Sequence, residues 1–272
     1  MPELPEVQVV VSTLQQQLGN CRISDVEVFW DNIIAMDVEE FKHRLIDETI
    51  QQYRRIGKYL IFECSRGIWV AHLRMEGKFY IYSQPHPKDK HTHVIFQLAD
   101  GRQLHYHDTR KFGKMAFYYF DEEKTMLKNI GLDVFDEHLD ALQLYRQWHQ
   151  RKIRLKAMLL DQSFMAGIGN IYADEICFSC NLHPASWVYR LSRKDFEQIL
   201  FHARRIMEGA VRSGGTTIRS YTSSLQVSGR FQLYLKVHQQ VGKPCPACGE
   251  KIIKCKVAGR GTYLCPNCQK RK

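Results

Sequence analysis

The chain has 272 residues, of which 44% are hydrophobic, and its formal net charge is +10. This length predicts about two domains, and the hydrophobic share is enough to build packed cores. No apolar run is long enough to cross a bilayer and no signal peptide is recognisable, which excludes a membrane-spanning or secreted class and leads us to expect a soluble, intracellular protein.

The first residues after Met1 are Pro2-Glu3-Leu4-Pro5-Glu6. If Met1 is removed, Pro2 carries a free secondary amine, and an α-amino group titrates at roughly 7.7 to 8.0, so a neutral, nucleophilic fraction exists near neutral pH. Glu3 would lie beside it as a proton donor or acceptor. The same residues also suit a helix start, because proline fits the first turn and acids there complement the helix dipole. The segment alone leaves both interpretations open.

Residues from about 22 to 120 contain short runs rich in β-branched and aromatic residues, separated by turn-forming pairs such as Asp100-Gly101. These runs predict the strands of a sandwich or a barrel. They are Val26–Val28, Tyr59–Glu63, Ile68–Leu73, His93–Leu98 and Met115–Phe120.

The pattern becomes mainly helical after residue 140. The periodicity predicts helices over Asp140–Gln150, Arg154–Asp161, Asn170–Phe178 and Arg193–Arg212. The last of these begins with a capping-box pattern, Ser192-x-x-Asp195, and ends at Gly214-Gly215.

A glycine-rich turn, Gly167-Ile168-Gly169-Asn170, precedes the third of these helices. Glycines allow backbone amides to approach a phosphate, and the N-terminus of the following helix favours an anion. A tight packing turn between helices would have the same sequence. In either case Asn170 is the expected helix cap.

Four cysteines near the C-terminus form two pairs at two-residue spacing, separated by sixteen residues: Cys245, Cys248, Cys265 and Cys268. Such pairs complete a tetrahedral thiolate shell, so they predict one structural zinc ion with no open coordination position. Paired redox dithiols are the alternative, but no thioredoxin-like pattern lies nearby. The other five cysteines follow no ligand spacing and are expected to be reduced packing residues.

The C-terminal segment is strongly basic. Residues 228–272 contain ten Lys or Arg and one acid, Glu250. A small zinc module with this charge most simply binds nucleic-acid phosphates, although a solvated or ribosome-binding surface has the same composition.

Motifs along the whole chain resemble those of bacterial formamidopyrimidine-DNA glycosylase. In chain order they are PELPEV, RRIGKYL around Lys58, HLRMEGK around Met75, HDTRKFG around Arg110, the GIGNIYADE turn, and CPAC to GRGTYLCPNCQK. The resemblance implies an α+β multidomain fold: an N-terminal β-sandwich (1–132), a helix-two-turn-helix domain with a lesion-recognition loop (133–227), and a zinc-finger β-hairpin (228–272). The recognition loop itself corresponds to residues from about 214 to 232.

The resemblance also implies a chemistry. The enzyme flips a damaged purine out of the duplex, the Pro2 amine attacks C1′, and the resulting Schiff base permits β- and δ-elimination of the phosphates. Glu3 assists by proton transfer, and Glu6 supports the site. Lys58 contacts phosphate and assists the proton transfers. Arg260 reaches the lesion phosphate from a tight hairpin turn formed by its flanking glycines.

Other residues match family positions that contact DNA. Met75, Arg110 and Phe112 match the wedge that fills the opened stack and contacts the orphaned base. The expected backbone contacts are His91, Arg151, Lys156 and Asn170. Thr109 and Lys111 depart from the proline and arginine common in the family, which could alter the turn that carries Arg110.

Two alternatives remain from the sequence. An endonuclease VIII-type glycosylase shares the architecture but prefers oxidised pyrimidines; Leu4 and the Met75, Arg110 and Phe112 set favour the purine enzyme. A non-catalytic zinc-ribbon protein that binds damaged DNA would leave the Pro2-Glu3 start without a purpose. The expected partner is double-stranded DNA with oxidised purines or abasic sites, bound by a monomer in the bacterial cytoplasm, at the nucleoid.

Overall fold

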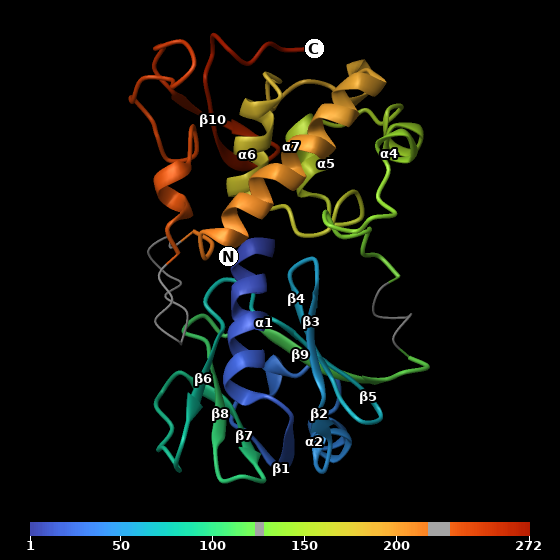
Figure 1. The fold of residues 1–272 in the computed structure, drawn as a ribbon, viewed down its shortest axis with the longest axis vertical. Helices are drawn as coiled ribbons and strands as arrows, with labels where there is room; N and C mark the ends of the chain where they lie inside the picture. The colour runs from blue at the N-terminus through green and yellow to red at the C-terminus, as the bar shows by residue number, and fades with distance from the viewer. Residues whose placement is uncertain (123–127, 217–228) are drawn as a thin grey trace. The chain divides into compact units, whose positions relative to one another are not determined.

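The computed structural model describes residues 1–122, 128–216 and 229–272. They form two compact units, shown in Figure 1. The first contains residues 1–122 together with Lys128, Thr216 and Gly229, and the second contains residues 129–215 and 230–272. In the described ranges, no helix is both long and apolar enough to cross a membrane. The expected division at residues 132/133 and 227/228 stays a prediction.

The first unit contains two antiparallel sheets. The five-stranded sheet has the order β2-β1-β7-β8-β6 and the four-stranded sheet has the order β3-β4-β5-β9. The strands of the first sheet are β1 Cys21–Val28, β2 Thr49–Ile50, β6 Lys78–Tyr82, β7 Thr92–Leu98 and β8 Gln103–His107. Those of the second are β3 Gln52–Ile56, β4 Tyr59–Glu63, β5 Gly67–His72 and β9 Lys114–Tyr119.

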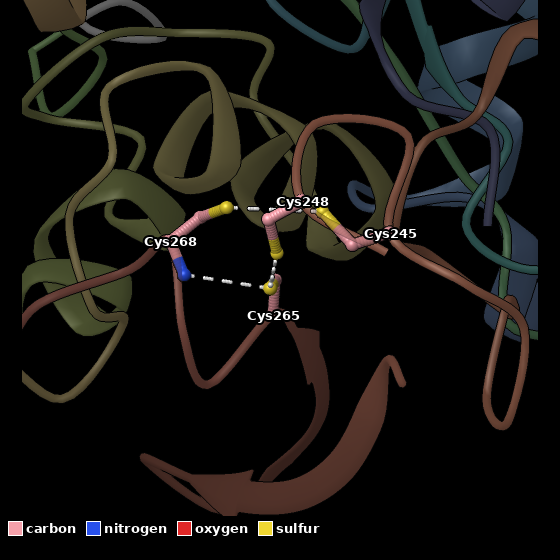
Figure 2. A group of neighbouring side chains, drawn as sticks. All are labelled: Cys245, Cys248, Cys265 and Cys268. Carbon is pink, nitrogen blue, oxygen red and sulfur yellow. Dashed lines mark hydrogen bonds between the residues drawn. The ribbon is translucent and has the colours of Figure 1, made fainter. Parts of the chain in front are cut away.

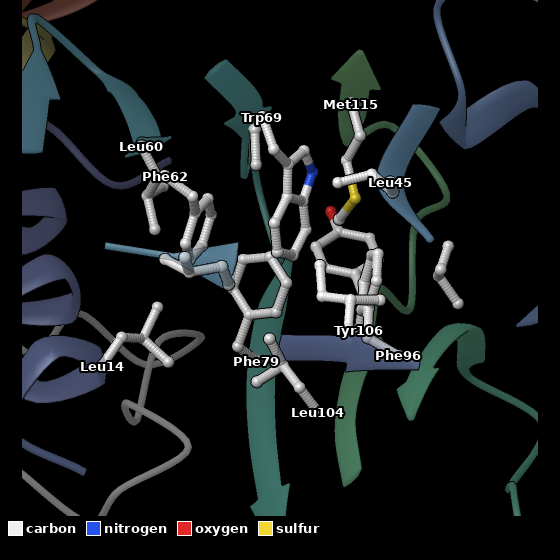
Figure 3. Packing of buried hydrophobic residues seen from close by; sticks show 14 of the residues in the cluster. Leu14, Leu45, Leu60, Phe62, Trp69, Phe79, Phe96, Leu104, Tyr106 and Met115 are labelled. Carbon is white, nitrogen blue, oxygen red and sulfur yellow. The ribbon is translucent and has the colours of Figure 1, made fainter. Parts of the chain in front are cut away.

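Aromatic side chains from the two sheets meet in one core (Figure 3). Phe62 on β4 stacks on Trp69 on β5, with ring centroids 4.1 Å apart, and Trp69 contacts Phe96 on β7 at 4.3 Å. Phe79 on β6 meets Trp69 edge to face at 5.8 Å. Side chains interdigitating between two sheet faces define a sandwich, so the predicted sandwich is confirmed and the barrel alternative is wrong.

Helix α1 (Leu4–Leu18) packs its apolar stripe onto the same core. The residues of this stripe are Val7, Val10, Val11, Leu14 and Leu18. The short helices α2 (Val38–Leu45) and η1 (Asp31–Ile33) complete the unit. Asp37 caps α2 by accepting a hydrogen bond from the Glu40 N–H at 2.9 Å.

The second unit consists of helices and one hairpin. The elements are α4 Ala141–Trp148, α5 Leu155–Leu160, α6 Asn170–Ser179, η2 Val188–Arg190, α7 Arg193–Arg212, η3 Phe231–Tyr234, β10 Ile253–Val257 and β11 Arg260–Leu264. The predicted capping box of α7 is present: the hydroxyl of Ser192 accepts from the Asp195 N–H, and Asp195 accepts from the Ser192 N–H at 2.7 Å.

The five predicted strands and four predicted helices are present, with bounds shifted by a few residues. Strands β2, β3, β6 and β8 and the short helix α2 were not predicted from the sequence. β3 (Gln52–Ile56) has only two apolar residues, and β8 (Gln103–His107) alternates polar and apolar residues over only five positions, so both signals are short and tertiary pairing decides the conformation.

Buried histidines make the first unit sensitive to acid. Burial lowers the pKa of His105 to about 4 and that of His72 to about 3, from 6.5. In the pH range between these pKa values and 6.5, the native state therefore binds fewer protons than the unfolded chain. The stability that depends on these two groups is complete above pH 6.5 and is expected to fall as the pH drops towards 4.

The substitution His105→Gln is expected to flatten this fall, because it removes one proton-uptake site from the unfolded chain. Urea unfolding followed by circular dichroism at several pH values between 7.5 and 4 measures the slope. His43→Gln, at an exposed position on α2, serves as the control. A slope in His105→Gln equal to that of the wild type would show that His105 does not contribute.

Candidate catalytic and DNA-binding site

The N-terminal segment is buried and tied to the start of α1. Pro2 is buried, and the exposed fractions of Glu3 and Glu6 are 3% and 6%. Glu3 is the N-cap, and its N–H donates to Glu6 Oε2 at 2.9 Å. The helix-start interpretation is therefore confirmed, and it is compatible with a reactive segment because the same contact holds Pro2 and Glu3 in place.

The second oxygen of the Glu6 carboxylate binds a distant residue of the same unit. Oε1 accepts from the Thr216 N–H at 2.8 Å and from the Thr216 hydroxyl at 2.9 Å. Glu6 thus joins the Glu3 backbone to Thr216. Thr216 was not among the predicted site residues, because no local pattern indicates a contact 210 positions away.

The predicted lesion-recognition loop, from about 214 to 232, follows Thr216 along the chain. Most of it lies outside the described residues, which omit 217–228. Its role in recognition therefore stays a prediction.

Lys58 lies at the tip of the β3–β4 hairpin. The closing pair is Ile56 and Tyr59, and Gly57 takes a φ of 56° at the first turn position, which suits a two-residue turn. Lys58 is only 5% exposed. Burial and the charges of Arg74 and Lys58, in that order, lower the pKa of His72 to about 3, so His72 is a neutral acceptor whose Nδ1 receives the Arg74 N–H at 3.0 Å.

The predicted wedge residues lie in two loops at strand ends. Met75, between β5 and β6, is half-buried, whereas Arg110 and Phe112, between β8 and β9, are exposed. The Arg110 guanidinium lies over the Phe112 ring, 4.7 Å from its centroid. An exposed aromatic held against a cation is available to stack on a base. His91 is partly buried beside the start of β7, and its carbonyl accepts from the Asp108 N–H.

In the second unit, Asn170 differs from the expected helix cap. Gly169 is the N-cap and Asn170 is the first residue of α6. Its Nδ2 donates to the Gly261 carbonyl at 3.1 Å, while its buried Oδ1 has no hydrogen-bond partner in the part of the chain that the structure describes. The predicted cap at Asn170 is wrong because glycine, with no side chain, can also occupy the N-cap position.

Lys156 has no exposed surface, contrary to the expectation of a direct phosphate contact. Its ammonium group donates to Asp174 Oδ1 at 2.7 Å, to the Thr262 hydroxyl at 2.9 Å and to the Gly261 carbonyl at 3.0 Å. Because three acceptors enclose the group, Lys156 joins α5 and α6 to strand β11. Removing one partner of such a buried ion pair costs about 3 to 5 kcal/mol.

The tight hairpin turn lies one residue earlier than predicted. Ala258 and Gly259, with φ of 49° and 74°, form the two-residue turn between β10 and β11, and both positive angles fit a type I′ turn. Arg260 is the first residue of β11 and is exposed. Gly261 is in the strand. Arg151 is also exposed, with its guanidinium 3.8 Å from the centre of the Trp148 ring.

Two adjacent acids on α6, Asp174 and Glu175, were not predicted as site residues. Asp174 Oδ2 accepts from His238 Nδ1 at 2.8 Å and from the Tyr263 N–H at 3.3 Å. Glu175 accepts three backbone N–H groups, from residues 236, 237 and 238. Burial raises the pKa of Glu175, although these donors oppose the shift. The only sequence signal is a pair of adjacent acids within an otherwise apolar run, Ile171–Phe178.

The four predicted zinc ligands meet at one point (Figure 2). Their sulfur atoms all lie within 4.8 Å of one another, with Cys245 to Cys268 at 3.8 Å and Cys248 to Cys265 at 3.5 Å. Tetrahedral zinc with bonds of about 2.3 Å places its sulfurs about 3.8 Å apart. The cluster therefore fits one zinc ion with four cysteine ligands, as predicted, and the redox alternative is not supported by this four-sulfur geometry.

Family models match three successive segments of the chain. Residues 1–115 match the formamidopyrimidine-DNA glycosylase N-terminal domain, residues 130–222 its H2TH domain, and residues 242–271 a zinc finger found in FPG and IleRS.

Relatives match over nearly the whole length. Formamidopyrimidine-DNA glycosylase of Oceanobacillus iheyensis is 42% identical, covering 100% of this chain and 99% of the relative. The protein of the same name from Exiguobacterium sibiricum is 44% identical, with 99% of each covered. A solved structure of a mutant Lactococcus lactis FPG with Fapy-dG DNA has a TM-score of 0.93 at 35% identity, covering 99% of this chain and 100% of that one. A MutM complex with DNA containing carbocyclic 8-oxo-G has a TM-score of 0.92 at 34% identity, with the same coverage.

The zinc site yields a direct prediction. Cys265→Ser is expected to release the metal and disorder the hairpin module, because binding to four thiolates is coupled to the folding of such small modules. Zinc content and affinity for duplex DNA should therefore fall together. The matched control is Cys255→Ser on β10, a cysteine outside the cluster, which should keep both. Full zinc occupancy and wild-type affinity in Cys265→Ser would contradict the site.

Proposed function

Since the chain belongs to the formamidopyrimidine-DNA glycosylase family and is a base-excision DNA repair glycosylase with lyase activity at abasic sites, we propose that it removes oxidised purines with Pro2 as nucleophile. The observation that carries this proposal is the buried N-terminal segment, in which Glu6 holds the Glu3 backbone directly beside Pro2. Proteins similar to this one are solved with Fapy-dG, 8-oxo-G and abasic-site DNA, which supports the substrate class.

The proposed chemistry begins once Met1 is removed and the target nucleotide is flipped. The neutral Pro2 amine attacks C1′, the bond between C1′ and the base breaks, and the base leaves as its proton is supplied. Glu3 takes part in this proton transfer. The Pro2 nitrogen then loses its proton, and the C1′–O4′ bond breaks as O4′ is protonated, which opens the sugar ring and leaves a C1′=N bond. Because Pro2 is a secondary amine, this bond is a cationic iminium, whereas a primary amine gives a neutral imine that must first be protonated. The positive charge makes the C2′ proton acidic.

Elimination follows from that acidity. Loss of the C2′ proton expels the 3′ phosphate, and a second elimination expels the 5′ phosphate, leaving a one-nucleotide gap with phosphate ends. Lys58 contacts phosphate and assists proton transfer, and Arg260 contacts the lesion phosphate. Arginine suits that contact because its planar fork can donate two hydrogen bonds to one phosphate.

The remaining residues bind the duplex. Met75, Arg110 and Phe112 fill the space left by the flipped base, and His91, Arg151 and Asn170 contact the backbone. Lys156 acts indirectly in this proposal, by holding Gly261 beside the exposed Arg260. The zinc ion keeps the hairpin folded. The protein is proposed to act as a monomer at the bacterial nucleoid in the cytoplasm.

Borohydride trapping tests the nucleophile. The protein is mixed with a duplex containing 8-oxoguanine opposite cytosine, reduced, and the cross-link is located by peptide mass. A covalent adduct on Pro2 is expected. Pro2→Gly should trap at least about tenfold more slowly, because its primary amine forms a neutral imine. Pro5→Ala, in the same segment, is the control. An adduct elsewhere, or none with folded, zinc-loaded protein on either a purine or an oxidised pyrimidine lesion, would contradict the proposal.

Thr216 provides a second test. Thr216→Val loses the hydroxyl donor to Glu6, whereas Thr216→Ser keeps it. Because small misplacements of reacting groups are costly, we expect the valine variant to excise 8-oxoguanine about tenfold more slowly in single-turnover reactions. The serine variant should remain close to wild type. Equal rates for the two variants would show that the contact between Thr216 and Glu6 does not position the active segment.

A further inference from the structure

All four backbone N–H groups of residues 110–113 donate to Asp108. Its Oδ1 accepts from Arg110 at 2.9 Å, its Oδ2 accepts from Phe112 at 2.9 Å and from Gly113 at 2.8 Å, and its carbonyl accepts from Lys111 at 3.2 Å. Asp108 itself has no exposed surface and follows directly after β8. One buried residue therefore determines the backbone path of a loop whose side chains face solvent.

Tyr106, two residues earlier on β8, lies against both wedge loops. Its hydroxyl is 3.5 Å from Asp108 Oδ2, and its ring packs at 5.2 Å on Phe79 in the core (Figure 3). A Cβ added at Gly113 would lie 1.7 Å from the Tyr106 hydroxyl oxygen, and one added at Gly77 would lie 2.2 Å from it. The two glycines close the loops that carry Phe112 and Met75, so both loops rest on one phenol oxygen.

Lys111 adds a third constraint on the second loop. Its φ is 57°, a left-handed conformation that is unfavourable for a residue with a side chain. Its ammonium lies 4.0 Å from the centre of the Trp30 ring, which offsets part of that cost. The strained residue separates Arg110 from Phe112, whose side chains then lie against each other.

We propose that Tyr106 and Asp108 are positioning residues that lock the Met75 loop and the loop of Arg110 and Phe112 to the end of β8, so that the three wedge side chains enter the duplex as one rigid unit. This inference rests on the proposed function. Neither Tyr106 nor Asp108 is proposed to contact DNA. They restrict the backbone conformations of the two loops before DNA binds, which lowers the entropy cost of inserting the wedge side chains.

Asp108→Asn is the first test. The amide keeps only one acceptor oxygen, and its NH2 group would face loop N–H donors, so at least one of the three backbone N–H contacts to this side chain is lost. Excision of 8-oxoguanine from a duplex should fall about 10- to 100-fold, since displaced contact residues cost rate steeply. The preference for cytosine over adenine opposite the lesion should fall towards unity. Cleavage of an abasic site in single-stranded DNA should remain unchanged, because no stack has to be filled.

The variant should therefore behave like Arg110→Ala and Phe112→Ala although neither wedge side chain is altered. Fluorescence of 2-aminopurine placed opposite the lesion reports insertion directly, and its change on binding should shrink in all three variants. Asp100→Asn is the matched control: Asp100 accepts a backbone N–H in the turn before β8 begins, away from the wedge loops. This control should keep wild-type rate, preference and fluorescence.

A double-mutant cycle tests Tyr106. Gly113→Ala places a methyl group against the hydroxyl oxygen, whereas in Tyr106→Phe the nearest atom becomes ring Cζ, which lies 2.7 Å from the added Cβ. The loss of duplex excision caused by Gly113→Ala should therefore be smaller in the Tyr106→Phe background, because residues in contact are not additive. Circular dichroism melts confirm that each variant is folded.

Two results would overturn the inference. One is a folded Asp108→Asn protein that keeps wild-type opposite-base preference and 2-aminopurine response. The other is an equal loss of single-stranded abasic cleavage and duplex excision, which would indicate general damage to the active segment. Absence of a Pro2 adduct in the wild-type protein would instead remove the proposed function, so the two failures are distinguishable.

Discussion

Buried carboxylates that accept backbone N–H groups hold the irregular segments of this chain in place. Glu6 fixes Glu3 and Thr216, Asp108 fixes the loop of residues 110–113, and Glu175 fixes residues 236–238. Irregular backbone has no ladder partners of its own, so each buried N–H needs another acceptor, and a carboxylate offers about four acceptor positions. The three carboxylates lie in the first turn of α1, directly after β8 and in α6. The position of each attached segment is therefore set by a helix or strand that is itself packed in a core.

The sequence predicted the parts of the fold that are set by periodicity and local chemistry. Helix α7 was found at its observed bounds because Ser192 and Asp195 form a capping box and Gly214-Gly215 follows its end. The zinc ligands were found because two-residue spacing is imposed by the metal's geometry. By contrast, β3 and β8 were missed because they are short and rich in polar residues, and pairing with neighbouring strands decides their conformation.

In the candidate site, too, local sequence patterns identified residues but did not predict the contacts they make in three dimensions. The motifs identified Lys156, but its burial against Asp174 depends on three elements meeting in space, and no spacing rule predicts that. The predicted cap at Asn170 and the predicted hairpin turn were each off by one residue. The observed cap is Gly169, and the observed turn begins at Ala258. Because glycines lie at neighbouring positions, the sequence does not decide between adjacent placements. The catalytic roles assigned to the N-terminal segment stay predictions, because they depend on chemistry with a bound nucleotide.

The proposed rigid wedge would have a thermodynamic advantage in an enzyme that flips a nucleotide out of a duplex. Unstacking a base costs a few kcal/mol, and inserting a flexible loop would add the entropy of ordering it. The structure places that ordering cost in folding, where the core contact between Tyr106 and Phe79 and the hydrogen bonds of Asp108 offset it. In the proposed binding mode, only the side chains of Met75, Arg110 and Phe112 remain to be ordered on DNA. More of the binding energy would then be available for unstacking, so the proposed base flipping would depend on the packing of the sandwich core.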